Sequence, residues 1–75
     1  MLNLNDIGKR VDEIGMRTIE LAEEAPLLSR TFDQAVRSGD RATAMICQIV
    51  MASRLTEAKE LQEEVTELRK KLSLI

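Results

Sequence analysis

The sequence predicts an all-α fold, and three observations support this prediction. Strong helix formers, chiefly Leu, Ala, Glu, Lys, Arg and Met, dominate the composition. Phe32 is the single aromatic residue, whereas strands favour aromatic and β-branched side chains. From Asp40 to Ile75 the chain contains neither proline nor glycine. We therefore expect three helices, of which the long C-terminal one organises a helical bundle or coiled-coil oligomer.

The first expected helix covers residues 5 to 25. Asn3 or Asn5 can cap its N-terminus, and Asp6 suits the positive end of the helix dipole. Pro26 is expected to end the helix, because proline disfavours the helical conformation of the preceding residue and has no N–H to donate. Apolar residues and one threonine form a single stripe at heptad spacing along this helix: Leu4, Ile7, Val11, Ile14, Thr18 and Leu21.

Small residues form a second column beside this stripe. Gly8, Gly15 and Ala22 follow one another at seven-residue intervals. Each glycine inside a helix costs ~1 kcal/mol relative to alanine. The column indicates either a close approach of another helix or an exposed surface on which glycine is tolerated.

The second and third expected helices cover residues 27 to 38 and 40 to 74. The second begins at Pro26 or is capped by Ser29. It ends at Gly39, which can adopt the left-handed conformation of a C-cap, and Asp40 then caps the third helix. The third helix is apolar on several faces from residue 42 to 52, as expected of a core segment.

From residue 53 to 75 the third helix is expected to form a coiled-coil seam. A helix of ~34 residues spans ~50 Å, whereas a first helix of ~20 residues covers only ~30 Å of it. The uncovered end needs a partner, and we expect a second copy of the chain in a homodimer or higher homo-oligomer. The predicted oligomer interface consists of Ala58, Leu61, Glu64, Val65, Leu68, Arg69, Leu72 and Ile75.

Two pairings of this seam are possible. In a parallel dimer Glu64 would face Arg69 of the second copy, and this match favours the parallel form. In an antiparallel dimer Glu57 would face Lys71 instead. Charge alone does not decide between them.

The chain has 75 residues, and we expect residues 1 to 75 to form one domain. Its net charge of −2, with both signs mixed along the sequence, creates no field that attracts nucleic acid or an anionic membrane. A single cysteine cannot form an intrachain disulfide, so Cys47 is expected to be a buried free thiol or, as the alternative, an intersubunit disulfide. The sequence shows no signal peptide and no apolar run long enough for a membrane span, which predicts a cytoplasmic protein.

The residue content argues against catalysis. There is no histidine to act as a base or zinc ligand, no serine or cysteine with an activating partner, and no glycine-rich phosphate loop. We therefore expect no catalytic residue, no cofactor and no metal. The expected function is a non-catalytic protein-interaction module, namely a homo-oligomeric adaptor, inhibitor or small chaperone-like subunit. Helix-in-groove spacing marks four candidate partner-binding residues: Leu4, Ile7, Val11 and Ile14.

The alternative is a small helix-turn-helix regulator that binds nucleic acid as a dimer. Residues 31 to 48 have the outline of this motif, with Ala35 in its first helix and Gly39 at the turn. However, a recognition helix needs polar and basic side chains, and residues 42 to 49 are mostly apolar. Nucleic acid is therefore the less favoured partner.

Overall fold

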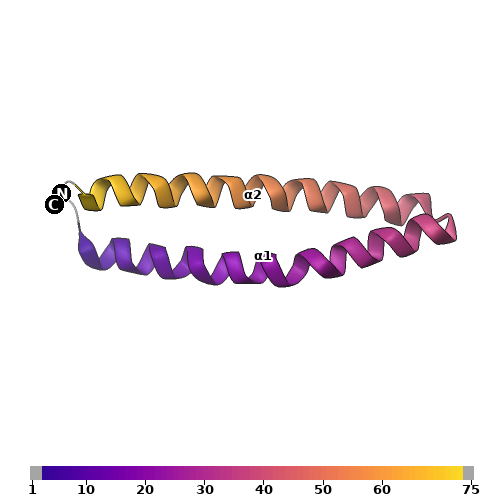
Figure 1. Cartoon of the computed structure of the whole chain (residues 1–75), viewed down its shortest axis with the longest axis horizontal. Coiled ribbons are helices and arrows are strands. Elements are labelled where there is room, and N and C mark those ends of the chain that lie inside the picture. The colour runs from indigo at the N-terminus through magenta and orange to yellow at the C-terminus, as the bar shows by residue number, and fades with distance from the viewer. Residues whose placement is uncertain (1–2, 74–75) are drawn as a thin grey trace.

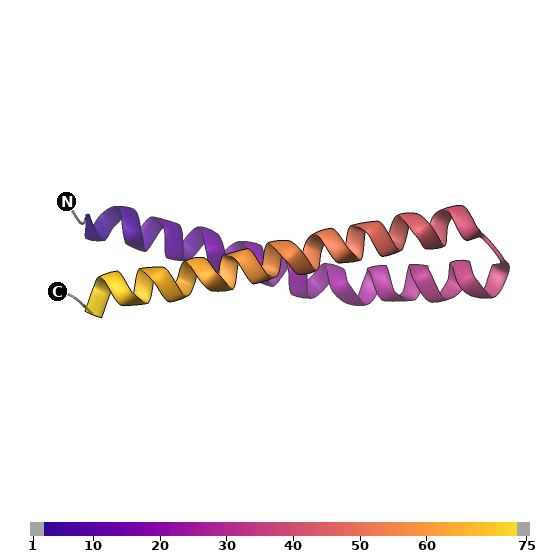
Figure 2. The ribbon, with the colours of Figure 1, turned by 90° about the horizontal axis from the view of Figure 1, so that it is seen from above.

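A computed structural model describes residues 3–73, which form two helices. α1 spans Leu4–Ser38 and α2 spans Arg41–Ser73. The helices lie side by side as an antiparallel hairpin that measures 56 × 15 × 14 Å (Figure 1). Seen from above, the two helices cross at a shallow angle near the middle of the hairpin (Figure 2). The prediction of an all-α fold is confirmed for the described residues, and the prediction of three helices is wrong.

The turn between the helices lies where the sequence predicted it. Gly39 adopts the left-handed conformation, with φ 76° and ψ 16°. Its N–H donates to the carbonyl of Val36 at 3.2 Å, and the N–H of Asp40 donates to the carbonyl of Ala35 at 2.9 Å. This pair of bonds is a Schellman motif. The Asp40 carboxylate then caps α2 by accepting the N–H of Thr43 at 3.1 Å.

Pro26 lies inside α1 rather than at its end. The proline removes one backbone hydrogen bond, and its ring crowds the carbonyl of Ala22, at a cost of ~3 kcal/mol. α1 bends near its middle, as a helix does at an internal proline (Figure 1). Continuing the helix brings Leu28, Phe32 and Ala35 towards α2, where all three are at least partly buried. Full burial of a Leu or Phe side chain contributes ~1.5–3 kcal/mol, so the partial burial of Leu28 and Phe32 offsets part of the cost of the proline.

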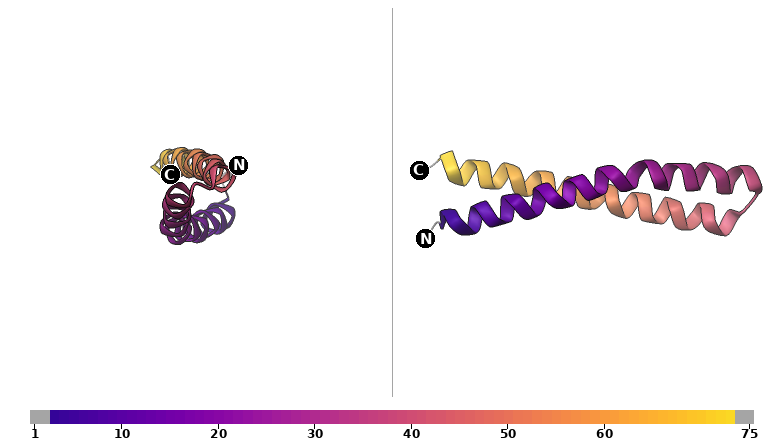
Figure 3. Two further views of the ribbon diagram at one scale, coloured as in Figure 1. Left: turned by 90° about the vertical axis from the view of Figure 1, so that its right-hand side faces the viewer. Right: turned by 90° about the horizontal axis from the view of Figure 1, so that it is seen from below.

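The continuous α1 changes the balance of lengths between the helices. α1 has 35 residues and α2 has 33, so α1 covers α2 from end to end. The C-terminal part of α2 was expected to extend beyond its neighbours, and this expectation is wrong. Figure 3 shows that the helices stay paired along their whole described length.

The contact between the helices repeats every seven residues. In α1 the inward column consists of Ile7, Ile14, Leu21, Leu28 and Ala35. In α2 it includes Cys47, Leu61 and Leu68. Ile14, Ala35 and Cys47 are the most buried apolar side chains, with only 4–5% of their surface exposed. Two helices alone therefore enclose a thin core and leave the flanks of both inward columns open.

Candidate protein-interaction groove

One side of the hairpin is closed by ion pairs between the helices. Arg10 donates from Nη2 to Glu64 Oε1 at 2.7 Å, and its Nε also donates to that carboxylate. Seven residues further along α1, Arg17 donates from Nη2 to Glu57 Oε1 at 2.9 Å and from Nε to Glu57 Oε2. Both pairs are bidentate, the geometry in which an arginine fits a carboxylate best. They hold the helices in one register.

Each of these arginines also binds a glutamate on its own helix. Arg10 Nη1 lies 3.1 Å from Glu13, and Arg17 Nη1 lies 2.9 Å from Glu20. The guanidinium groups are thus shared between an intrahelical and an interhelical carboxylate. This repeated arrangement makes the ion-pair side polar along much of the hairpin.

The ion pairs shift the acidity of the α2 glutamates. Hydrogen bonds from Arg17 hold the pKa of Glu57 below its usual value of 4.5, although partial desolvation opposes the shift. Hydrogen bonds from Arg10 lower the pKa of Glu64 in the same way. Both carboxylates therefore stay ionised, and keep their partners, throughout the neutral and mildly acidic range.

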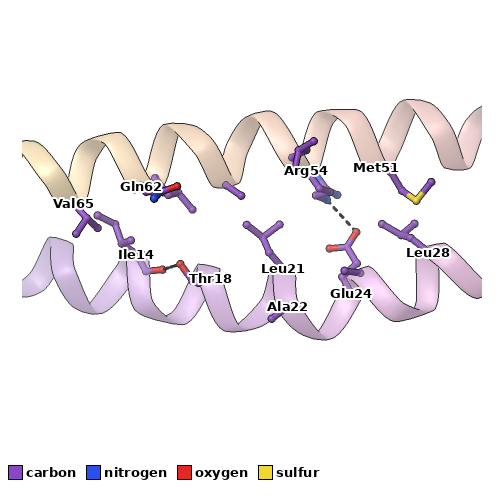
Figure 4. Close-up of a pocket in the computed structure, with 14 residues that line it drawn as sticks. Ile14, Thr18, Leu21, Ala22, Glu24, Leu28, Met51, Arg54, Gln62 and Val65 are labelled. Atoms are coloured by element: carbon purple, nitrogen blue, oxygen red, sulfur yellow. Dashed lines mark hydrogen bonds and ion pairs between the residues drawn. The ribbon is translucent and has the colours of Figure 1, made fainter.

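The other side of the hairpin contains an apolar groove with a volume of about 710 Å³. Glu24 and Arg54 are the charged residues of its wall, and they pair with each other at 3.0 Å (Figure 4). The groove therefore presents no unpaired charge among its lining residues. Its centre is lined from α1 by Thr18, Leu21, Ala22, Ala25 and Leu28, and from α2 by Met51, Leu55, Ala58, Leu61, Gln62 and Val65, with Ile14 completing the lining.

The lining combines small and large side chains, which gives the groove its depth. Ala22, Ala25 and Ala58 leave space, whereas Leu28 and Met51 point towards each other across it (Figure 4). Leu55 is the most exposed large apolar residue between residues 3 and 73, with 74% of its surface open. Concave apolar surfaces of this kind accept the apolar face of another helix.

The structure places the predicted oligomer interface partly in this groove. Ala58, Leu61 and Val65 line it. Leu68 is half-buried between the helices, and Leu72 is 41% exposed at the open end. Ile75 lies outside the described residues.

The charged residues of that predicted interface behave differently. Glu64 binds Arg10 of its own chain instead of being left for Arg69 of a second copy. Arg69 is exposed. The proposed parallel pairing assumed a free Glu64, and this assumption is wrong because the full-length α1 supplies an arginine beside it.

The four candidate partner-binding residues differ in their exposure. Ile7 and Ile14 face α2, and Ile14 is buried. Leu4 is 60% exposed and Val11 is 46% exposed. The stripe was expected to bind a partner as a whole, but Ile7 and Ile14 pack against α2, and only Leu4 and Val11 stay exposed.

The column of small residues on α1 has no close neighbour within the chain. A Cβ atom added at Gly8 or Gly15 would meet nothing within 4 Å. Of the two readings of this column, a close approach of another helix of the same chain is absent at these two glycines, and both glycines lie on an exposed surface. Ala22, the third member of the column, lines the groove.

A second apolar surface lies on the back of α2, close to the turn. Met45, Ile46 and Ile49 each expose 61–64% of their surface. The sequence predicted a core segment here, because residues 42 to 52 are apolar on several faces. That expectation is wrong for these three side chains, since a hairpin has only one neighbouring helix to cover α2.

Other predicted features can be placed in the described residues. Cys47 is a buried free thiol, as expected. Within residues 3–73 no group of three His, Cys, Asp or Glu side chains is arranged to hold a metal ion. Neither described helix combines the length and apolarity needed to cross a membrane.

The signals for the groove in the amino-acid sequence are weaker than those for the inward column. Leu55 and Gln62 stand in one heptad column, and Ala22 stands in the column of the two glycines. Only the position of the neighbouring helix shows that these columns flank the contact between the helices.

Comparisons with protein-family models, with curated proteins and with solved structures each found no match to this chain.

Proposed function

We propose that this chain is a non-catalytic protein-interaction module that associates with other helices through its apolar groove. The observation that supports this proposal is the asymmetry of the hairpin. One side is closed by bidentate ion pairs, whereas the other is open, apolar and about 710 Å³ in volume. Concave, mostly apolar surfaces of this kind are common binding sites for a partner.

The groove suits an amphipathic helix as its occupant. It follows the central part of the hairpin, from Ile14 to Leu28 on α1 and from Met51 to Val65 on α2, and its lining residues repeat at helical spacing on both helices. A helix with apolar residues at positions i, i+3 or i+4, and i+7 would place them between the two walls. An adaptor, an inhibitor or a small chaperone-like subunit would each use such a surface.

The groove proposal can be tested with a matched pair of variants. Leu55→Glu places a carboxylate in the groove, while Thr56→Glu adds the same charge at the next residue, which is exposed and is not among the groove-lining residues. Each protein would carry an affinity tag and would be co-expressed in the host cell with an untagged copy of itself. After capture on the tag, mass spectrometry would identify the polypeptides that remain bound. We expect at least one polypeptide that the wild type and Thr56→Glu retain and Leu55→Glu loses.

Identical capture by all three proteins would contradict the proposal. Titration with a random DNA duplex at low salt examines the alternative. Binding that weakens steeply as salt is added would favour the nucleic-acid regulator. In the structure the segment that outlined a helix-turn-helix forms the antiparallel bend of the hairpin, and no observation favours that alternative.

A further inference from the structure

We infer that the occupant of the groove is a second copy of this chain, packed so that both turns lie at the same end of a four-helix bundle. This inference rests on the proposed function, because it names the partner of the same groove. It is supported by the surface area that the hairpin leaves exposed, by the shape of the groove and by the charges that border it.

The exposed area is too large for a folded monomer of this mass. The hairpin exposes 6176 Å². A compact monomer of 8.5 kDa exposes ~4700 Å², so the excess is ~1500 Å² per chain. Obligate homodimers bury ~1000–2500 Å² per subunit. The excess area per chain lies within this range.

The shape of the groove also fits an identical hairpin. Its lining extends from Ile14 to Leu28 on α1 and from Met51 to Val65 on α2, which is the central part of each helix. A two-fold axis through the centre therefore superimposes one groove on the other along their whole length. Ala22, together with the glycine column that continues it, allows the second hairpin to approach closely.

The charges bordering the groove differ between the helices. On α2, Arg41 and Arg69 stand in the heptad column of the groove-lining Leu55, and Lys59 follows the groove-lining Ala58. All three basic residues are exposed. Arg41 and Arg69 lie beyond the two ends of the groove on α2, and Lys59 lies beside its centre.

On α1 the charges in the corresponding columns are acidic, and they also lie beyond the two ends of the groove. Asp12 and Asp33 stand in the heptad column that follows the groove-lining Ala25 by one residue, and both are exposed. On α1 the heptad columns of Ala22 and of Asp33 contain no basic residue. On α2 the heptad columns of Leu55 and of Lys59 contain no acidic residue.

This difference selects one of the two symmetric arrangements. A two-fold axis perpendicular to the bundle would place α1 beside the α1 of the second copy, so that the acidic residues of one copy would lie beside those of the other. A two-fold axis along the bundle places α1 beside the second α2 instead, so that the helix with the acidic residues faces the helix with the basic ones. The residue numbers of Asp33 and Arg41 add up to the same value as those of Arg17 and Glu57, which face each other across the hairpin. Asp33 and Arg41 therefore lie at the same level along the bundle. Opposite charges in contact fix the orientation of such an interface.

The mass in solution tests the second copy as occupant. We expect light scattering to give a dimer for the purified wild type, at twice 8.5 kDa, and a monomer for Leu55→Glu. Ile49→Glu is the matched control, because Ile49 is 64% exposed but lies on the back of α2. It should remain a dimer. Helical content measured by circular dichroism should stay high in both variants, because neither side chain belongs to the core of the hairpin.

Two outcomes separate this inference from the proposed function. A monomeric wild type with capture of another protein that still depends on Leu55 would overturn the second copy as occupant and leave the interaction module standing. A monomeric wild type without Leu55-dependent capture would overturn both. A dimer that Ile49→Glu disrupts and Leu55→Glu leaves intact would place the interface on the back of α2 and would also overturn the inference.

The orientation has its own measurement. A spin label on Ser38→Cys, in a Cys47→Ala background, reports the distance between the two turns. With both turns at one end the labels lie within ~30 Å, since neighbouring helix axes are 8–10 Å apart. With turns at opposite ends they lie ~50 Å apart, the length of a 33-residue helix. The longer distance would overturn the same-end arrangement.

Discussion

Arg17 and Glu57 face each other across the hairpin, and both carboxylate oxygens of Glu57 accept a hydrogen bond from the guanidinium of Arg17. Arg10 and Glu64 repeat this arrangement one heptad away. In both pairs the two residue numbers add up to the same value, as expected when two antiparallel helices keep one register. The ion-pair side therefore fixes how α1 and α2 are aligned, and the groove side remains open.

Exchanging the charges of one pair tests this register. Arg17→Glu or Glu57→Arg alone should lower the melting temperature by several degrees, because each puts like charges opposite each other. The double exchange should recover part of the loss. Thermal denaturation followed by circular dichroism at one protein concentration measures the effect. Additive losses in the double variant would show that the two residues do not interact.

Acid should destabilise the hairpin below about pH 4.5. The pKa values of Glu57 and Glu64 are lowered from 4.5 by their arginine partners, so their contribution is complete above the unfolded-state value and is lost as the pH falls through the lower folded-state values. Asp40 adds a contribution of the same sign, because Thr43 lowers its pKa. Urea unfolding across this pH range measures the effect.

A variant with Glu57→Gln and Glu64→Gln serves as the control for acid lability. It should be less stable than the wild type at neutral pH, and its stability should fall less between neutral pH and the acid range. An equal acid dependence in the two proteins would assign the loss to other carboxylates.

Pro26→Ala should stabilise the hairpin. The substitution restores a backbone hydrogen bond and relieves the crowding of the Ala22 carbonyl, which together are worth up to ~3 kcal/mol in a helix interior. Glu23→Ala, on an exposed position of the same helix, is the control and should change stability far less. Chemical denaturation gives the free energies of unfolding. A loss of stability in Pro26→Ala would show that the bend in α1 is needed for packing on α2.

Gly39→Ala should destabilise the turn by ~1–2 kcal/mol, because Gly39 has a φ of 76° and a side chain is strained there. Gly39→Asn should lose less, since asparagine tolerates the left-handed conformation better than alanine. Chemical denaturation of the three proteins provides the ranking. If alanine and asparagine were equally tolerated, the Schellman geometry of the turn would be in doubt.

Cys47 should react slowly with a thiol reagent in the folded protein. Its side chain is buried between the helices, with 5% of its surface exposed. The reaction should be fast in denaturant and slow in buffer, and a spectrophotometric thiol assay gives both rates. A Ser53→Cys variant in a Cys47→Ala background provides an exposed thiol for comparison. Equal rates for the two sites in buffer would contradict the burial of Cys47.

Several local features were predictable from sequence because short segments decide them. The helical class follows from the composition and from the lack of proline and glycine after Asp40. The turn follows from Gly39, which suits a left-handed C-cap, and from Asp40, which caps the next helix. In both cases the free energy depends on neighbouring residues, so propensity and capping rules apply directly.

The ion pairs and the groove were not predictable in the same way. Glu64 was assigned to a second copy because nothing in the sequence placed Arg10 beside it. The apolar residues Met45, Ile46 and Ile49 were assigned to the core because their number suggested several neighbouring helices. Both errors arose from one wrong helix boundary at Pro26.

The sequence by itself determined that this protein is helical, that it turns at Gly39 and that apolar residues repeat along each helix. Tertiary structure alone decided that α1 continues through Pro26, which apolar columns face α2, and which remain open as the groove. The physical reason is that proline imposes a local cost of a few kcal/mol, whereas the compensation comes from contacts with α2 that are distant in sequence. Only the folded arrangement brings the cost and the compensation together.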